Sequence, residues 1–90
     1  MEVLVFGKEG CHLCDLVEAE IRSMKRLRAD MTVVDIDDDE AYYARYWTRI
    51  PVVVVDGREV FEAKDMDPGG EWKKSLSALL AGSRTKPTLR

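Results

Sequence analysis

Hydrophobic and polar positions in the first part of the chain follow two different spacings, and each spacing predicts a different element. Residues 2–6 (EVLVF) are a run of β-forming residues bounded by Gly7, so we expect a buried strand there. From His12 onward, apolar residues recur at three- and four-residue steps, as on one face of an α-helix that ends near Asp30. The apolar positions of that face are Leu13, Leu16, Val17, Ile21, Met24 and Leu27.

A second strand and a short helix are predicted next. Residues 31–37 (MTVVDID) contain several β-branched residues and are assigned to the strand. Residues 38–47 are assigned to the helix, and Asp37 with Glu40 three residues later resembles a capping box at its start. Acidic residues also suit the positive end of the helix dipole. We interpret the aromatic residues of this segment as helix packing residues: Tyr42, Tyr43, Tyr46 and Trp47.

A hairpin and a final helix complete the pattern. The dipeptide Asp56-Gly57 stands between two short strand-like runs, residues 52–55 and 58–62, and is typical of a two-residue type I′ turn. Residues 71–82 then predict a helix. Its apolar face holds Trp72, Leu76, Leu79 and Leu80, with Gly82 near its end.

The predicted element order is therefore β-α-β-α-β-β-α. Because a helix joins the first two strands, we expect them to be parallel, with a right-handed crossover, whereas the hairpin strands pair antiparallel. This order predicts an α/β fold with a mixed four-stranded sheet flanked by helices. Residues 1–82 would form one domain, and residues 83–90 (SRTKPTLR) would form a flexible tail.

Length, charge and hydropathy argue against several classes of protein. The chain has 90 residues, which suffices for one modest core. Its net charge of −3 argues against a nucleic-acid-binding protein, which would usually present a basic face. No stretch approaches the roughly 18 apolar residues of a membrane span. Because the start (MEVLVF) also lacks the features of a signal peptide, we expect a cytoplasmic protein.

The two cysteines, Cys11 and Cys14, point to metal or redox chemistry, because a secreted disulfide scaffold of this size would usually carry more. Cys11 falls at or just before the first turn of the predicted helix, where unpaired amides and the helix dipole favour a thiolate, which is the reactive form. Cys14 lies one turn further on and is placed to attack a mixed disulfide formed at Cys11. From these positions in the predicted helix, we assign Cys11 as the nucleophile and Cys14 as the resolving thiol.

Other interpretations of the motif remain open at this point. A structural zinc ion takes four ligands, whereas the chain offers Cys11, Cys14 and the neighbouring His12, so we expect no metal site within one chain. Two chains could share an iron–sulfur cluster through their cysteines. The domain could also be a binding or adaptor module that docks a partner through an apolar surface around Leu13 and Ile50. Finally, the cysteines could be inert packing residues.

A second local signal is the Ile50-Pro51 pair. A proline at the start of a strand has no N–H to donate to the neighbouring strand. A cis Ile50–Pro51 bond would explain the proline, because it turns the chain sharply and exposes the backbone of Ile50 to a partner. The chain resembles the thioredoxin superfamily in three features. These are the first strand, the C-x-x-C motif at a helix start, and an Ile-Pro pair before an Asp-Gly hairpin. The closest branch is that of the small bacterial glutaredoxin-like proteins, over about residues 2–81.

The resemblance implies specific roles for several residues. Cys11 would be the nucleophile and Cys14 the resolving cysteine. Pro51 would be cis and pack beside the disulfide, and Ile50 would offer its backbone to the cysteine of glutathione. Lys8, from a K-x-x-C pattern, would help to bind a glutathione carboxylate.

The chain also departs from the glutaredoxin pattern. The inner pair of the motif is His12-Leu13, and Arg49 stands where glutaredoxins have the threonine of Thr-Val-Pro. His12, Leu13 and Arg49 are therefore candidate substrate contacts. Arg49 would bind a carboxylate of the substrate. The Gly-Gly-Cys-Asp segment that contacts the γ-glutamyl group has no clean counterpart near Gly69-Gly70.

These features together predict a thiol–disulfide oxidoreductase that serves cell redox homeostasis. We expect no bound cofactor, with glutathione as a candidate co-substrate. The partners would be a disulfide-containing protein or a glutathione mixed disulfide, together with a reductase that restores the dithiol. We expect the protein to act as a monomer, without nucleic acid or membrane.

Overall fold

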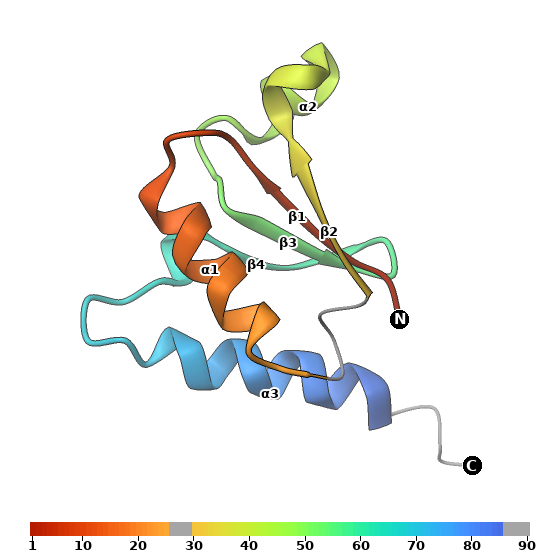
Figure 1. Ribbon diagram of the computed structural model, residues 1–90, viewed down its shortest axis with the longest axis vertical. Coiled ribbons are helices and arrows are strands. Elements are labelled where there is room, and N and C mark those ends of the chain that lie inside the picture. Colours follow the sequence, from red (N-terminus) through yellow and green to blue (C-terminus); the bar gives the residue numbers. More distant parts are fainter. Residues whose placement is uncertain (26–29, 86–90) are drawn as a thin grey trace.

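The chain folds into the order of strands and helices that the pattern predicts. The structure is a computed structural model, and it describes residues 1–25 and 30–85. The elements are β1 (Val3–Gly7), α1 (His12–Arg22), β2 (Met31–Asp35), η2 (Ile36–Asp38), α2 (Glu40–Tyr46), β3 (Val52–Val55), β4 (Arg58–Glu62), η3 (Ala63–Asp65) and α3 (Trp72–Thr85). Figure 1 shows α1 and α3 together on one side of the sheet, with α2 beyond the end of β2. None of the helices described is long and apolar enough to cross a membrane.

Within the described residues, the four strands form one mixed sheet in the order β2-β1-β3-β4. β1 pairs parallel with β2 and antiparallel with β3, which pairs antiparallel with β4. The predicted α/β architecture is thus confirmed. Asp56 and Gly57 turn the hairpin with positive φ angles of 49° and 85°, as a type I′ turn requires.

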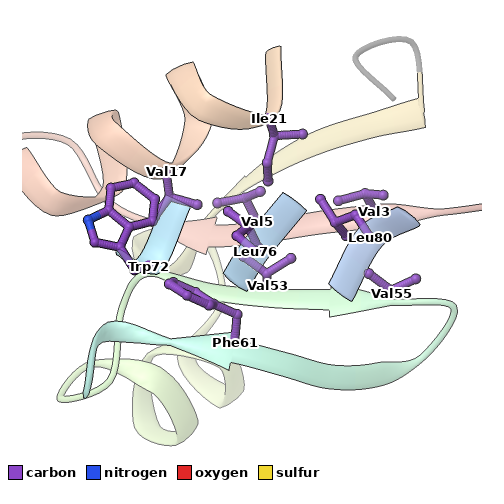
Figure 2. Packing of buried hydrophobic residues seen from close by; sticks show 10 residues of the cluster. All are labelled: Val3, Val5, Val17, Ile21, Val53, Val55, Phe61, Trp72, Leu76 and Leu80. Carbon is purple, nitrogen blue, oxygen red and sulfur yellow. The ribbon is translucent and has the colours of Figure 1, made fainter. Parts of the chain in front are cut away.

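Alternating residues of the central strands face opposite sides of the sheet, and each side has its own core. On one side, residues of β1 and β3 pack against α1 and α3 (Figure 2). This cluster contains Val3, Val5, Val17, Ile21, Val53, Val55, Phe61, Trp72, Leu76 and Leu80. On the other side, Phe6, Ile36, Tyr46, Val52 and Val54 form the second cluster. Because both sides of β3 are covered, all four of its valines are buried.

The buried face of α1 differs from the predicted one. Cys14, Val17 and Ile21 face the sheet, whereas Leu13 and Leu16 are 42% and 37% exposed. A helix turns about 100° per residue, so the two leucines are rotated away from the stripe that Cys14, Val17 and Ile21 define. The helix also ends at Arg22, well before Asp30, and Leu27 lies outside the described residues.

The predicted capping box of α2 is wrong. Asp37 lies in η2, and Asp39 is the N-cap instead. The Asp39 carboxylate accepts hydrogen bonds from the amides of Ala41 (2.8 Å) and Tyr42 (3.2 Å). The run of four acids from Asp37 to Glu40 left several equivalent candidates, and the turn of η2 decided between them.

The aromatic residues of α2 divide between core and surface. Tyr46 is buried against Phe6, with ring centroids 4.5 Å apart, as a packing role predicts. Tyr42, Tyr43 and Trp47 are exposed, and the rings of Tyr43 and Trp47 stack on each other outside the core. The packing interpretation is therefore confirmed for Tyr46, and Tyr42 also contacts the Phe6 ring, with centroids 5.0 Å apart. Trp47 packs on Tyr43 at the surface and adds nothing to the core.

The final helix is longer than predicted and buries fewer leucines. Trp72, Leu76 and Leu80 face the core, whereas Leu79 is 42% exposed. α3 continues to Thr85, so the first residues of the predicted tail, 83–85, are helical. Residues 86–90 lie outside the described part of the chain.

Candidate functional site

Cys11 and Cys14 form a disulfide at the start of α1, with their Cα atoms 5.2 Å apart. Cys11 is the N-cap of the helix, and its backbone is extended rather than helical. Its carbonyl accepts the first helical hydrogen bond, from Asp15 N–H at 3.1 Å. Its sulfur accepts a hydrogen bond from the Cys14 amide, also at 3.1 Å. The Cys11 sulfur thus occupies the place that a serine or aspartate oxygen takes in an ordinary N-cap.

The two sulfurs differ in access. Cys14 is buried, with 1% of its surface exposed, whereas Cys11 is half-buried. A substrate approaching from solvent therefore meets Cys11 first, which is the order that a nucleophile and a resolving thiol require.

Gly7, at the end of β1, makes room for the buried cysteine. A Cβ at this position would stand 2.9 Å from Cys14 Sγ and 3.1 Å from Cys14 Cβ, closer than van der Waals contact allows. In the sequence, Gly7 marks only the end of the predicted strand. The usable signal was a glycine at the end of a buried strand, which often marks a close approach of another group.

The loop between β1 and α1 is a tight turn that places Cys11 at the helix start. Gly10 adopts a positive φ of 85°, which side chains other than glycine rarely adopt. The amide of Cys11 donates to the carbonyl of Lys8 at 3.2 Å and closes the turn. Figure 1 shows this turn at the end of β1, leading directly into α1.

Pro51 lies at the same end of the sheet as the disulfide. The β1–β3 register pairs Phe6 with Val52, so the residue before Val52 comes opposite Gly7. Pro51 is fully buried, and the Ile50–Pro51 peptide bond is cis. Topology therefore brings Pro51 and the cysteines to one corner from distant parts of the sequence.

Arg49 is held by carboxylates of β4. Its Nε donates to Glu62 Oε1 at 2.8 Å, and its terminal nitrogen pairs with Glu59. The Arg49 carbonyl also accepts from the Ala63 amide at 3.1 Å. Hydrogen bonds from Arg49 lower the pKa of Glu62 below its ordinary value. Arg49 thus fastens the segment before Pro51 to the sheet edge.

The other predicted contact residues lie on both sides of the disulfide. Lys8 forms an ion pair with Asp37 at 3.6 Å, and its ammonium lies 6.0 Å from the Tyr43 ring centre. Ile50 is half-buried against the second core cluster. His12 and Leu13 are exposed and line a groove of about 430 Å³ between α1 and the segment that precedes α3. The structure thus separates Lys8, on the α2 side, from His12 and Leu13, on the α3 side.

The groove also contains residues that the sequence pattern does not mark as substrate contacts. Leu16 of α1 lines it together with Met66, Asp67, Pro68 and Trp72. The Asp-Pro-Gly-Gly stretch signalled a turn before a helix, but its position against α1 depends on tertiary packing. Among the residues described, no group of three or more histidine, cysteine or acidic side chains could hold a metal ion.

Comparisons with known proteins agree with this geometry. The model of the glutaredoxin-like domain (DUF836) matches residues 2–78. A solved structure of XcR50, a structural-genomics target protein from X. campestris, is 27% identical, with a TM-score of 0.61, over 84% of this chain and 96% of that one. Thioredoxin 1 from Thermosipho africanus TCF52B is 19% identical, with a TM-score of 0.57, over 94% of this chain and 100% of that one, and this likeness concerns the fold. No curated protein sequence matches the chain significantly.

The family match covers nearly all of the described elements, from β1 through most of α3, and it includes both cysteines. The sheet order and the disulfide at the start of α1 agree with it. The chain therefore belongs to the glutaredoxin-like domain family and has a thioredoxin-like fold.

Proposed function

We propose that the protein is a thiol–disulfide oxidoreductase in which Cys11 attacks a substrate disulfide and Cys14 resolves the intermediate. The observation that carries the proposal is the asymmetry of the pair: Cys11 caps α1 and is accessible, whereas Cys14 is buried behind it. Membership in the glutaredoxin-like family supports redox chemistry at these cysteines.

The helix start favours the ionised form of Cys11 in the reduced protein. The Cys14 amide, 3.1 Å from the Cys11 sulfur, is one of the free N–H groups of the first turn, and the helix dipole adds to its effect. Both stabilise a thiolate more than a thiol. We expect them to lower the pKa of Cys11 below the ordinary thiol value of about 8.5.

The reaction is balanced by two successive exchanges. The Cys11 thiolate attacks one substrate sulfur, a Cys11–substrate bond forms, and the released sulfur takes up a proton. Cys14 then loses its proton and attacks the Cys11 sulfur, which forms the Cys11–Cys14 disulfide and releases the second substrate sulfur. Two electrons pass from the protein dithiol to the substrate. Two thiols, such as two glutathione molecules, or the dithiol of a reductase return them.

The working setting follows from the same chemistry. A dithiol that reduces others must itself be kept reduced, which favours the cytoplasm over an oxidising compartment. A single chain contains both cysteines, so the proposal requires only a monomer. Its partners are a protein disulfide and a source of reducing equivalents.

Single substitutions of the two cysteines test the proposal. Reduction of a model protein disulfide such as insulin is measured for wild type, Cys11→Ser and Cys14→Ser. Cys11→Ser should abolish the reaction, because the attacking sulfur is gone. Cys14→Ser should accumulate a mixed disulfide at Cys11, visible by intact-mass spectrometry. Equal activity of wild type and Cys11→Ser would reject the proposal.

A further inference from the structure

A groove with apolar walls reaches the start of α1, where His12, the residue after Cys11, is part of its lining. It lies between the first turns of α1 and the segment leading into α3, and its apolar walls come from Leu13, Leu16, Met66, Pro68 and Trp72. Its volume of about 430 Å³ is within the range of small-ligand sites. His12, which directly follows Cys11, also lines it, so an occupant would sit beside the attacked bond.

The exposed leucines of α1 are part of this wall. Leu13 and Leu16 leave 42% and 37% of their surface in water, although three other residues of the same helix are buried in the core. Single exposed leucines are ordinary on protein surfaces. Here two of them share one concave surface, and Leu13 stands between the two cysteines in the chain. Their exposure provides apolar area for an occupant of the groove.

The end of the groove at α3 does not favour an anion. The first amides of a helix are an anion-binding position, but here Asp67 already occupies it. Its carboxylate accepts from the amides of Glu71 (2.9 Å) and Trp72 (2.7 Å). The hydrogen bond from Glu71 is the main cause that lowers the pKa of Asp67, so this carboxylate is ionised at neutral pH. An incoming carboxylate would meet a negative charge and amides that are already bonded.

The cation on the groove wall is also engaged. The ammonium of Lys73 lies 5.8 Å from the centre of the Trp72 ring, in a cation–π position. Lys73 therefore only partly offsets the charge of Asp67, and the groove complements an uncharged, apolar occupant better than an anionic one.

We propose that this groove receives an apolar side chain of a protein substrate that flanks the attacked cysteine, and that it discriminates against acidic neighbours of that cysteine, including those of glutathione. The proposal rests on the oxidoreductase function proposed above. The dimensions fit, because Leu16 lies five residues beyond Cys11, about 7.5 Å along the helix axis. The neighbouring residue of an extended substrate lies about 3.4 Å along its strand, and its leucine side chain extends further in the direction of Leu16. A side chain next to the attacked cysteine therefore reaches the leucines.

The test uses symmetric disulfide dimers of three short capped peptides, in which leucine, serine or glutamate stands on both sides of the cysteine. Symmetry makes the two sulfurs equivalent, so the rates report only the flanking residues. Wild type should reduce the leucine dimer with a kcat/KM about tenfold above that of the serine dimer, as one apolar contact allows. The glutamate dimer and glutathione disulfide should be slower than the serine dimer.

Two leucine variants test whether the preference for the leucine dimer arises in the groove. Leu16→Ser should bring the ratio of the leucine to the serine dimer close to one, mainly through KM. Leu79→Ser is the matched control, because Leu79 is a similarly exposed leucine on α3 outside the groove. It should retain the wild-type ratio.

The outcomes separate this proposal from the function on which it depends. If wild type reduces the three dimers and glutathione disulfide equally well, and Cys11→Ser reduces none, the oxidoreductase function stands and the groove proposal is overturned. A preference for leucine that Leu16→Ser retains also overturns it. If Cys11→Ser is as active as wild type on every dimer, the proposed function itself fails.

Discussion

Gly7 at the end of β1 and Cys14 in α1 are in direct contact, and the contact requires that Gly7 has no side chain. A Cβ at Gly7 would stand 2.9 Å from the Cys14 sulfur. Since Cys14 is buried and its helix packs on the sheet, neither partner has room to move aside. The strand thus holds the resolving sulfur against the sheet, while Cys11 remains accessible.

Gly7→Ala should destabilise the protein by about 1–3 kcal/mol, as overpacking of a core usually does. Urea unfolding under reducing conditions measures the cost. In a double-mutant cycle, the cost should be smaller in a Cys14→Ala background, because most of the overlap is with the sulfur. An equal cost in both backgrounds would mean that another contact of Gly7 is responsible.

The pH profile of alkylation tests the environment of Cys11. In reduced Cys14→Ser, iodoacetamide can label only Cys11, and the rate should rise with a midpoint below about 8.5. The reason is the amide of the first helical turn, 3.1 Å from the Cys11 sulfur. The unfolded variant in urea supplies the reference midpoint. A folded midpoint at or above that reference contradicts thiolate stabilisation by the helix.

Replacement of Arg49 tests whether its ion pairs with β4 stabilise the segment that precedes β3. Arg49→Gln removes the pairs with Glu59 and Glu62 and should lower stability by about 1 kcal/mol, because surface pairs contribute modestly even in a network. The loss should shrink at high salt. Arg58→Gln, at an exposed position of β4, is the control and should change stability less. A loss of kcat/KM on an uncharged disulfide without any loss of stability would instead point to contact with substrate.

The Asp67 carboxylate should stabilise the start of α3 at neutral pH. Hydrogen bonds from the Glu71 and Trp72 amides lower its pKa, so the unfolded state binds the proton more tightly than the folded state does. The contribution is therefore complete above about pH 4, the unfolded value, and is lost as the pH falls through the lowered folded value. The urea midpoint of Asp67→Ala should lie below that of wild type at neutral pH, and the gap should narrow under acid conditions.

Asp38 in η2 provides the control for Asp67→Ala. Asp38→Ala changes the net charge equally at an exposed position. Its midpoint should differ little from that of wild type. If the gap for Asp67→Ala stays constant with pH, or if Asp38→Ala shows the same gap, the amide contacts of Asp67 are not the cause.

Truncation of two neighbouring residues of α1 should lower stability by different amounts. Val17→Ala removes buried methyl groups and should cost about 1–3 kcal/mol, whereas Leu16→Ala should cost less than about 0.5 kcal/mol. The reason is that Val17 is fully buried and Leu16 is exposed. Urea unfolding of the two variants measures the difference. Equal costs would show that the leucine face contributes to folding.

Much of the fold could be predicted because local patterns encode it. The valine run 52–55, the Asp56-Gly57 turn and the spacing of Val17 and Ile21 each predict an element without reference to the rest of the chain. The position of Cys11 at a helix start is also local, since it follows from the change of pattern at His12. The N-cap of α2 could not be chosen in this way, because consecutive acids offered equivalent local solutions.

The order of elements, the C-x-x-C motif at a helix start and the Ile50-Pro51 pair before a strand all follow from local patterns of residues. By contrast, the burial of Cys14, the exposure of Leu16 and the need for a glycine at position 7 result from the docking of α1 on the sheet. The physical reason is that periodicity records which residues share a helix or strand, whereas the side that is buried depends on how each element docks on the sheet.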